Sequence, residues 1–388
     1  MNIPFLDLVS PHRELKDELL KVCSSAFDTA GFIGGPLVSN FEKEFAQFCG
    51  VKNCVVVNSG TDALRFSFMA GGIKPGNLVL TVPNTFIATT EAISQAGATP
   101  IFVDVDEKTY NIDPEKIKDY IARECVIKNN VLIEVLRNRP VTAIVPVHLY
   151  GQCADMDAIQ EIADEFNLMV FEDSCQGHGA KYYSRKDCRW KIAGSMSKAA
   201  SFSFYPGKNL GACGEGGAVT TDSDEIAAKI RMIRDHGQSQ KYYHEMEGYN
   251  GRLDAIQCGI LSVKLKQLPF WTEQRRTAAK LYHEKLYSHP GITVPFEPEW
   301  SKAVYHLYVI RNKNRDTLMA HLGSKGIATG LHYPVPLHLQ NAYSQAGYKK
   351  GDFPVTEKAA EEILSLPMFP GLTEEMVNKV AEEIKSFG

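Results

Sequence analysis

One lysine stands in a segment that is unusually rich in aromatic and glycine residues. Residues 201–217 have the sequence SFSFYPGKNLGACGEGG, which places Lys208 between two short β-rich runs. Burial in such surroundings would lower the pKa of the amine, and a lysine that forms a Schiff base with an aldehyde needs that shift. Most lysines are solvated surface charges, and the residues alone leave the two interpretations evenly balanced.

Three further segments place polar or aromatic residues after β-rich runs, where parallel α/β sheets bind their ligands. NSGTDAL, residues 58–64, opens a helix whose free N–H groups would form a cup for a phosphate. Asp173 leaves an apolar run in FEDSCQ, and Phe86 follows another run in NTFIAT. Taken singly, a capped turn, a helix N-cap and a core ring are the simpler interpretations of these three segments.

Together the four segments supply a phosphate cup, a carboxylate for a ring nitrogen, an amine for an aldehyde and a flat face for stacking. Pyridoxal 5'-phosphate (PLP) needs all four. The chain has no G-x-G-x-x-G fingerprint and no P-loop, which argues against a nicotinamide-dependent oxidoreductase. No H-E-x-x-H motif or other ligand pattern occurs, so no metal site is predicted.

Short β-rich runs alternate with stretches that are long enough for helices. The runs lie at 54–57, 78–82, 101–105, 142–148, 168–172, 201–205 and 217–221. This alternation predicts a mainly parallel seven-stranded sheet with helices on both faces. The last gap is too short for a crossover helix, so we expect the final two runs to pair in antiparallel fashion.

Helical patterns flank this core. A helix is predicted over 39–49, where Ser39 and Glu42 have capping-box spacing. The C-terminal third combines α and β signals: a long helix near 271–288, strand-like runs at 303–310 and 326–331, and amphipathic helices near 356–365 and 373–387. We therefore expect a large domain over 1–264 and a smaller α+β domain over 265–388.

Composition is that of an ordinary folded enzyme. Hydrophobic residues make up 44% and charged residues 23%, and the net charge of −4 offers no basic surface for nucleic acid. The nine cysteines include no C-x-x-C pair, and neither a signal peptide nor a membrane span is indicated. A cytoplasmic protein without a nucleic-acid or membrane partner is the resulting expectation.

The chain resembles, nearly end to end, the sugar aminotransferases of the DegT/DnrJ/EryC1/StrS family. Nine ordered segments carry the resemblance: FIGGPLVSNFEKEF, NSGTDAL, NTFIAT, VHLYG, FEDSCQGHGA, SFSFYPGKNLGACGEGGAVTTD, GYNGRLDAIQ, HYPVPLHLQ and LPMFPGLTEEMV. The resemblance implies a PLP-dependent enzyme with the α/β architecture known as fold-type I. A related branch of dehydratases has His in place of the lysine, so Lys208 argues against that branch.

The resemblance also implies roles for individual residues. Lys208 would bind the cofactor aldehyde and shuttle the proton, and Asp173 would face the pyridine nitrogen. The implied cofactor-binding residues are Gly60, Thr61, Phe86, Asp173, Gln176, Ser203 and Lys208, together with Asn250 from the partner subunit of a homodimer with shared active sites.

Within the family, the segments around the lysine and HYPVPLHLQ resemble the branch that acts on 3-keto nucleotide-linked deoxysugars. The implied reaction moves an amino group from glutamate to the sugar ketone, as in deoxyaminosugar or polysaccharide biosynthesis. His332 and Tyr333 would line the sugar site, or they would have only a structural role in a β-turn. Arg252 would bind the donor carboxylate or the sugar pyrophosphate, with a salt bridge as the simpler alternative. A 4-keto sugar aminotransferase, a keto-inositol aminotransferase and a non-catalytic PLP-binding regulator remain open.

Four features depart from the family pattern. Cys175 stands where Ala is common and Glu215 where many relatives have Asp. Segments 123–138 and 181–198 look longer than usual, and we expect that the second could reshape the mouth of the substrate site.

Overall fold

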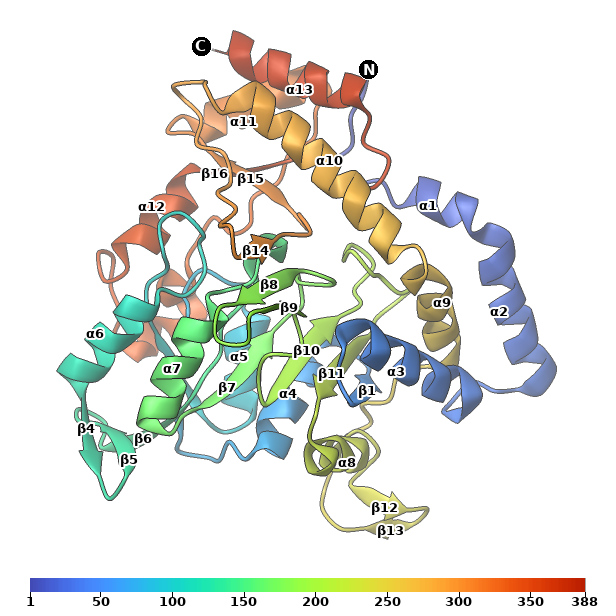
Figure 1. The fold of residues 1–388 in the computed structure, drawn as a ribbon, viewed down its shortest axis with the longest axis vertical. Coiled ribbons are helices and arrows are strands. Elements are labelled where there is room, and N and C mark those ends of the chain that lie inside the picture. The colour runs from blue at the N-terminus through green and yellow to red at the C-terminus, as the bar shows by residue number, and fades with distance from the viewer. Residues whose placement is uncertain (388) are drawn as a thin grey trace.

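The computed structural model describes residues 1–387, and a nine-stranded sheet lies at its centre (Figure 1). Seven strands cross the sheet in the order β1 (Asn53–Val57), β11 (Gly217–Thr221), β10 (Ala199–Ser203), β7 (Met169–Asp173), β6 (Arg139–Ile144), β2 (Leu78–Thr81) and β3 (Thr99–Phe102). β11 is antiparallel to β1 and β10, whereas β10, β7, β6, β2 and β3 are parallel. The mainly parallel sheet and the antiparallel pairing of its last two strands confirm the sequence prediction.

Both segments that look longer than usual fold as hairpins. In segment 123–138, β4 (Cys125–Lys128) pairs with β5 (Val131–Glu134). β5 also pairs in antiparallel fashion with the first residues of β6. In segment 181–198, β8 (Lys181–Ser184) pairs with β9 (Arg189–Ile192) and with β14 (Ser301–Lys302). A third small hairpin joins β12 (Gln238–Gln240) to β13 (Tyr243–His244) and projects from the lower edge of the molecule in Figure 1.

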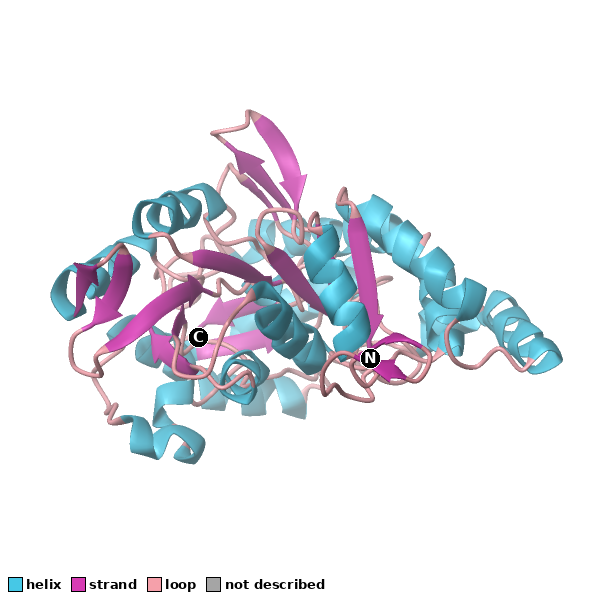
Figure 2. Cartoon of the chain, turned by 90° about the horizontal axis from the view of Figure 1, so that it is seen from below, coloured by secondary structure: helices cyan, strands magenta, loops and turns pink. Residues whose placement is uncertain are grey.

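Helices cover both faces of the large sheet (Figure 2). Val55 and Val57 of β1 pack in one apolar cluster with α4 (Gly60–Gly71), α5 (Ala88–Gln95) and α8 (Asp224–Ile233). The alternate residues Cys54 and Val56 pack in a second cluster with α3 (Gly35–Cys49) and α9 (Ala255–Leu265). Because successive strand side chains point to opposite faces, an unbroken apolar run serves two helix layers at once. α6 (Pro114–Glu124) and α7 (Met156–Phe166) pack in a third cluster with β2, β3 and β6.

The start of α3 differs from the prediction. Ser39 and Glu42 were expected to cap a helix at residue 39, but α3 begins at Gly35, with Gly34 as its N-cap and Pro36 in the first turn. Proline at that position needs no N–H partner and favours an earlier start. Ser39 Oγ instead donates to Pro36 O at 3.2 Å, and Glu42 pairs with Arg234 at 2.6 Å.

The C-terminal region has an apolar core of its own. That core joins the long helix α10 (Leu268–Leu286), β15 (Tyr308–Arg311), α11 (Arg315–Ser324), β16 (Ile363–Leu366) and α13 (Glu374–Ser386). β15 and β16 pair in antiparallel fashion. The predicted helix over 356–365 is therefore divided into α12 (Pro354–Glu362) and β16, and the predicted run at 326–331 forms only isolated bridges at Ile327 and Gly330.

The first residues of the chain also reach this core. Ile3 pairs with Ile327, is buried and packs among the C-terminal residues. The chain then continues into α1 (Val9–Glu14) and α2 (Lys16–Thr29), which lie at the outer edge of the molecule in Figure 1, with α2 packed against α9. The division at residue 264 stays a prediction, and these contacts link the N-terminus to the part beyond it.

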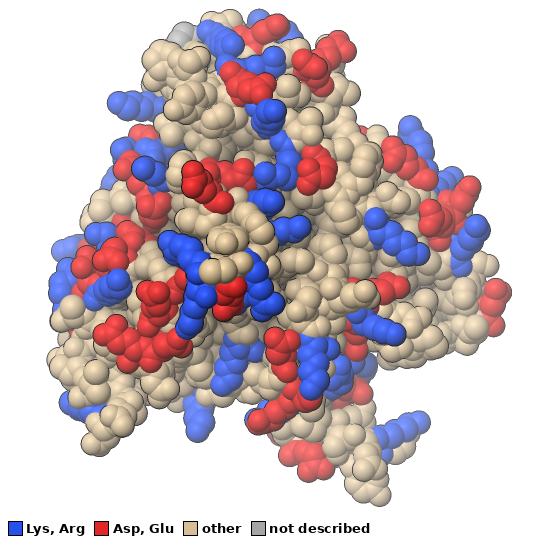
Figure 3. Space-filling view, viewed as in Figure 1, with Lys and Arg blue, Asp and Glu red and all other residues tan. Residues whose placement is uncertain are grey.

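Charged side chains of both signs are interspersed on the face shown in Figure 3. Among the described residues, no helix combines the length and hydropathy that crossing a membrane requires.

Candidate active site

The predicted site residues meet in one cavity of about 540 Å³, which is the size of a small-molecule site. It opens beyond the carboxyl ends of β1, β2, β7 and β10, where parallel sheets bind ligands. The lining includes the predicted residues Gly60, Thr61, Phe86, Asp173, Gln176, Ser203, Lys208 and Tyr333. Two larger clefts of about 810 and 800 Å³ lie elsewhere and contain none of these residues. Chemistry rather than size therefore identifies the candidate site.

The N-terminus of α4 forms one end of the cavity. Ser59 caps this helix by accepting a hydrogen bond from Asp62 N at 3.1 Å, and the N–H groups of Gly60 and Thr61 in the same turn remain available. A Cβ at Gly60 would lie 2.6 Å from Ser203 Cβ, so only glycine permits this approach of α4 to β10. Helix N–H groups with the hydroxyls of Thr61 and Ser203 make a cup that suits a phosphate.

Asp173 ends β7 and faces the cavity with 5% of its surface exposed. Thr89 Oγ1 donates to one carboxylate oxygen at 2.7 Å, and the Cys175 N–H donates to the other at 3.2 Å. The peptide on either side is fixed as well, because Asp173 N–H donates to Pro146 O and Asp173 O accepts from His148 N–H. A carboxylate held in this way is suited to partner a protonated ring nitrogen.

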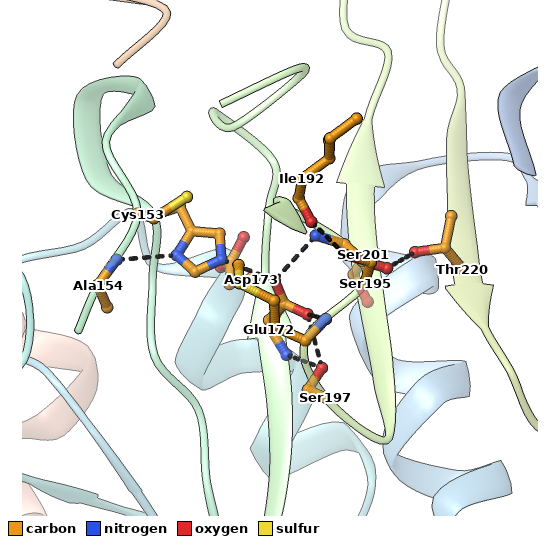
Figure 4. A network of polar contacts seen from close by, with 12 residues as sticks. Cys153, Ala154, Glu172, Asp173, Ile192, Ser195, Ser197, Ser201 and Thr220 are labelled. Carbon is orange, nitrogen blue, oxygen red and sulfur yellow. Dashed lines mark hydrogen bonds and ion pairs between the residues drawn. The ribbon is translucent and has the colours of Figure 1, made fainter. Parts of the chain in front are cut away.

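Glu172, the preceding residue, points to the opposite side and anchors the strand end (Figure 4). Its fully buried carboxylate accepts from Gly194 N–H and Met196 N–H, both at 2.8 Å, and from His148 Nε2 at 2.9 Å. Since His148 Nδ1 accepts from Ala154 N–H at 3.2 Å, the ring proton sits on Nε2. Burial alone would raise the pKa of Glu172, but the hydrogen bonds from His148 and the backbone outweigh it and lower that pKa.

Substitution of Glu172 by Gln is expected to lower the free energy of unfolding by about 3 kcal/mol, because an amide would present N–H groups to donors that now share a carboxylate. A carboxyl whose pKa is lowered in the folded protein adds to the free energy of unfolding above about pH 4.3, its pKa in the unfolded chain. That addition is lost as the pH falls through the pKa of the folded protein. The difference between wild type and variant in urea titrations should therefore shrink in acid. A difference that stays constant down to pH 3 would contradict the assignment.

Lys208 reaches the cavity from the loop between β10 and β11 and is half-buried. Among the described lining residues it is the only cationic side chain. Burial, and next to it the Lys208 charge, lowers the pKa of His178 to about 3 and that of His332 to about 4. Neither imidazole lines the cavity, so among the described lining residues Lys208 has the one side-chain nitrogen that can serve as a nucleophile or base.

Gln176, Tyr333 and Phe86 line the cavity together. The Gln176 side chain accepts from Tyr150 N–H at 2.7 Å and donates to Tyr333 Oη at 3.2 Å. The Tyr333 ring lies 5.7 Å from the Phe86 ring, between centroids. Phe86 is 55% exposed, so its face is free to stack on a ligand rather than being packed in the core.

Three predicted site residues do not line the cavity of this chain. Asn250 is exposed at the molecular surface. Arg252 forms an ion pair with Asp235, the arrangement that the simpler interpretation predicted. His332 turns its Nδ1 to Ser365 Oγ at 2.9 Å and stacks on Phe5.

Segment 181–198 does not reach the mouth of the cavity either. None of its described residues lines it, because β8 is paired with β14 instead. The expectation that this segment could reshape the mouth therefore finds no support in its position.

Sequence reasoning missed several lining residues. Thr85, Thr89 and Tyr205 all contribute to the wall, although their segments were recognised. A signal existed for Thr89, because it lies one helical turn beyond Phe86 and repeats the hydroxyl of Thr85 at i+4 spacing.

The residues fit PLP. The cup at α4, the buried carboxylate, the single amine and the exposed aromatic face correspond to the phosphate, ring nitrogen, aldehyde and ring of that cofactor. The close approach of an imagined Gly60 Cβ to Ser203 shows that α4 lies directly against β10 at the cup, so a larger residue at position 60 would push the two elements apart.

Comparison with known proteins agrees with this geometry. The model of the DegT/DnrJ/EryC1/StrS aminotransferase family matches residues 13–385. A pleiotropic regulatory protein of Geobacillus stearothermophilus is 43% identical and is covered to 99%, with 100% of this chain aligned. A dTDP-3-amino-3,4,6-trideoxy-alpha-D-glucose transaminase of Streptomyces venezuelae is 39% identical over 99% of this chain and 96% of its own.

Solved structures show the same likeness. The structure of S. venezuelae DesV in complex with a ketimine intermediate has a TM-score of 0.92 at 38% identity and covers 100% of this chain and 98% of that one. Fold and cavity place the protein in the fold-type I class of PLP-dependent enzymes. The chain belongs to the DegT/DnrJ/EryC1/StrS aminotransferase family, and its cofactor is PLP.

Proposed function

We propose that the protein transfers the amino group of glutamate to the C3 ketone of a nucleotide-linked deoxysugar. The observation that carries this proposal is the meeting of Lys208, Asp173 and the α4 cup in one cavity. The transaminase of Streptomyces venezuelae, 39% identical over nearly the whole chain, supports the sugar class and the carbon position. Nine free cysteines are compatible with a reducing, cytoplasmic setting.

Each residue would have a distinct task when the cofactor is bound. PLP supplies an electron sink for the carbanion that forms at the donor α-carbon. Gly60, Thr61 and Ser203 would hold the phosphate, and Phe86 would stack on the ring. Asp173 would hold a proton on the ring nitrogen, since a nearby carboxylate favours the cation.

Lys208 would hold the cofactor covalently and then move the proton of the donor α-carbon. Its amine is poised for that task because the nearby pyridinium disfavours a second positive charge. Gln176 and Tyr333 line the cavity and would lie next to the ring, and the hydrogen bond between them keeps both side chains in place. His332 would support the sugar-binding segment through Ser365 rather than touch the ligand from its present position.

The direct experiment supplies PLP-loaded protein with glutamate and measures 2-oxoglutarate and the absorbance of the cofactor amine form. A panel of 3-keto and 4-keto nucleotide sugars and a keto-inositol then identifies the acceptor by product mass and NMR. We expect amination at C3. Amination at C4 or of the inositol alone would replace the proposed acceptor. A cofactor that glutamate leaves unchanged would favour the non-catalytic regulator, and the relative from Geobacillus stearothermophilus is named a regulatory protein.

We also propose that two copies of the chain complete each site. The exposed apolar side chains Phe27, Phe32 and Ile33, at 70%, 43% and 58% exposure, support an interface on the side of the N-terminal helices. Asn250 is exposed and absent from the lining of its own cavity, which supports its use in the partner's site. Lys208 is the one cationic side chain among the described lining residues, so an additional donor for the phosphate is chemically reasonable.

Subunit mixing tests this arrangement. Asn250→Ala and Lys208→Ala homodimers should each be nearly inactive, whereas a mixed dimer should regain activity, because one of its two sites has both Lys208 and Asn250 of the partner subunit. Rescue would be measured after co-expression of differently tagged chains. Activity that does not rise above that of either parent would contradict a shared site.

A further inference from the structure

The turn that carries Phe86 also carries two buried hydroxyl groups that lead to Asp173. Thr89 Oγ1 donates to Asp173 Oδ2 at 2.7 Å, and Thr85 Oγ1 lies 2.9 Å from Thr89 Oγ1. Thr85 is 3% exposed and Thr89 is 1% exposed, yet both line the cavity. We infer that Thr89 is a positioning residue for Asp173 and that Thr85 acts through it, an inference that rests on the proposed PLP-dependent function.

The direction of these hydrogen bonds follows from proton counting. An ionised carboxylate has no proton to donate, so the single Thr89 proton must point to Asp173. Thr89 Oγ1 can then only accept from its other neighbour, which makes Thr85 the donor of that bond. The chain therefore runs from Thr85 to Thr89 to Asp173, and each bond polarises the next.

The same turn fixes the ring face and the carboxylate relative to each other. Phe86 lies between Thr85 and Thr89 in sequence, and Phe86 O accepts from Thr89 N–H at 3.2 Å. The Thr89 side chain then spans from this first turn of α5 to the end of β7. The hydrogen bond from Thr89 thus limits the rotation of the Asp173 carboxylate, so that its position relative to a ring stacked on Phe86 would be fixed.

Valine has the shape of threonine but lacks the hydroxyl, and serine keeps the hydroxyl. Loss of the Thr89 donor leaves Asp173 Oδ2 without its side-chain partner and free to rotate away from the ring nitrogen. With a less firmly held proton on the ring nitrogen, less positive charge lies beside the point where Lys208 would join the cofactor, so the absorbance of the bound cofactor should change with pH at a higher midpoint. Loss of the Thr85 hydroxyl weakens the same bond only indirectly.

The test uses the PLP-loaded full chain with the variants Thr89→Val, Thr89→Ser and Thr85→Val. The PLP dissociation constant and the pH midpoint of the bound-cofactor absorbance are measured, together with the melting temperature of the cofactor-free protein. Thr89→Val should weaken PLP binding about tenfold and raise the midpoint by about one pH unit. Thr85→Val should change both in the same direction but by less, about threefold in affinity. Thr89→Ser should stay within about twofold of wild type.

Two results would overturn the inference. One is a wild-type midpoint and affinity in Thr89→Val. The other is an equal fall in melting temperature for all three variants with an unchanged midpoint, because a purely structural hydroxyl would behave in that way. Failure of the proposed function would look different, since glutamate would then leave the cofactor bound to wild-type protein unchanged, whereas the effects of the threonine substitutions on PLP affinity would still be measurable.

Discussion

Replacement of Lys208 by alanine is expected to abolish multiple-turnover amination, with a loss of at least about 10⁴-fold in kcat. Lys208 would provide both the covalent attachment and the proton transfer, and the cavity lining contains no second amine among the described residues. The neighbouring histidines do not replace it. His332 has a pKa lowered to about 4 and hydrogen-bonds to Ser365, and His178 is buried behind the wall against Phe202 and Phe204.

Three controls make this result specific. Lys208→Arg keeps the positive charge but not the nucleophile and should be as inactive as the alanine variant. Lys198→Ala removes an exposed lysine before β10 and should keep wild-type activity. Borohydride treatment of PLP-loaded wild type should add the cofactor mass to the peptide with Lys208 and to no other. Sustained turnover by the alanine variant would show that another group does the chemistry.

Much of this site could be predicted from sequence because its parts are local. The α4 cup depends on a glycine and a capping serine within four residues, and the lysine loop depends on a dense run of glycine and aromatic residues. Parallel strands then bring the segments together, since their carboxyl ends share one edge. Sequence distance does not matter to that argument, which is why residues as far apart as Gly60 and Lys208 could be assigned to one cavity.

The remaining features depend on contacts that no local pattern encodes. The Thr89 hydroxyl resembles any first-turn threonine until β7 places Asp173 2.7 Å away. The helix predicted over 356–365 continues only to Glu362, because Ile363–Leu366 pairs with β15 and becomes β16. Arg252 could have faced a ligand, but its guanidinium forms an ion pair with Asp235 instead. In each case a tertiary neighbour decided between two locally acceptable outcomes.

Substitution of Asp173 by asparagine is expected to reduce kcat about 10³-fold while the protein stays folded. The asparagine carbonyl can still accept from Thr89, whereas its amide group replaces the oxygen that accepts from Cys175 N–H and carries no charge that could favour a proton on the ring nitrogen. The electron sink would then lack its positive charge. The measurements are kcat with glutamate and the melting temperature, with Asp164→Asn on α7 as an exposed control.

Charge at the ring nitrogen, rather than the carboxylate as such, is the quantity under test in the Asp173→Asn variant. A cofactor analogue methylated at that nitrogen carries a permanent positive charge, so it should restore part of the activity of Asp173→Asn. The same analogue should not raise the activity of the wild-type protein. An asparagine variant that keeps near-normal turnover with natural PLP would show that the carboxylate does not protonate the ring. An inactive variant that the methylated analogue fails to rescue would instead assign Asp173 to placing the ring, through the same contacts that Thr89 and Cys175 make with its two oxygens.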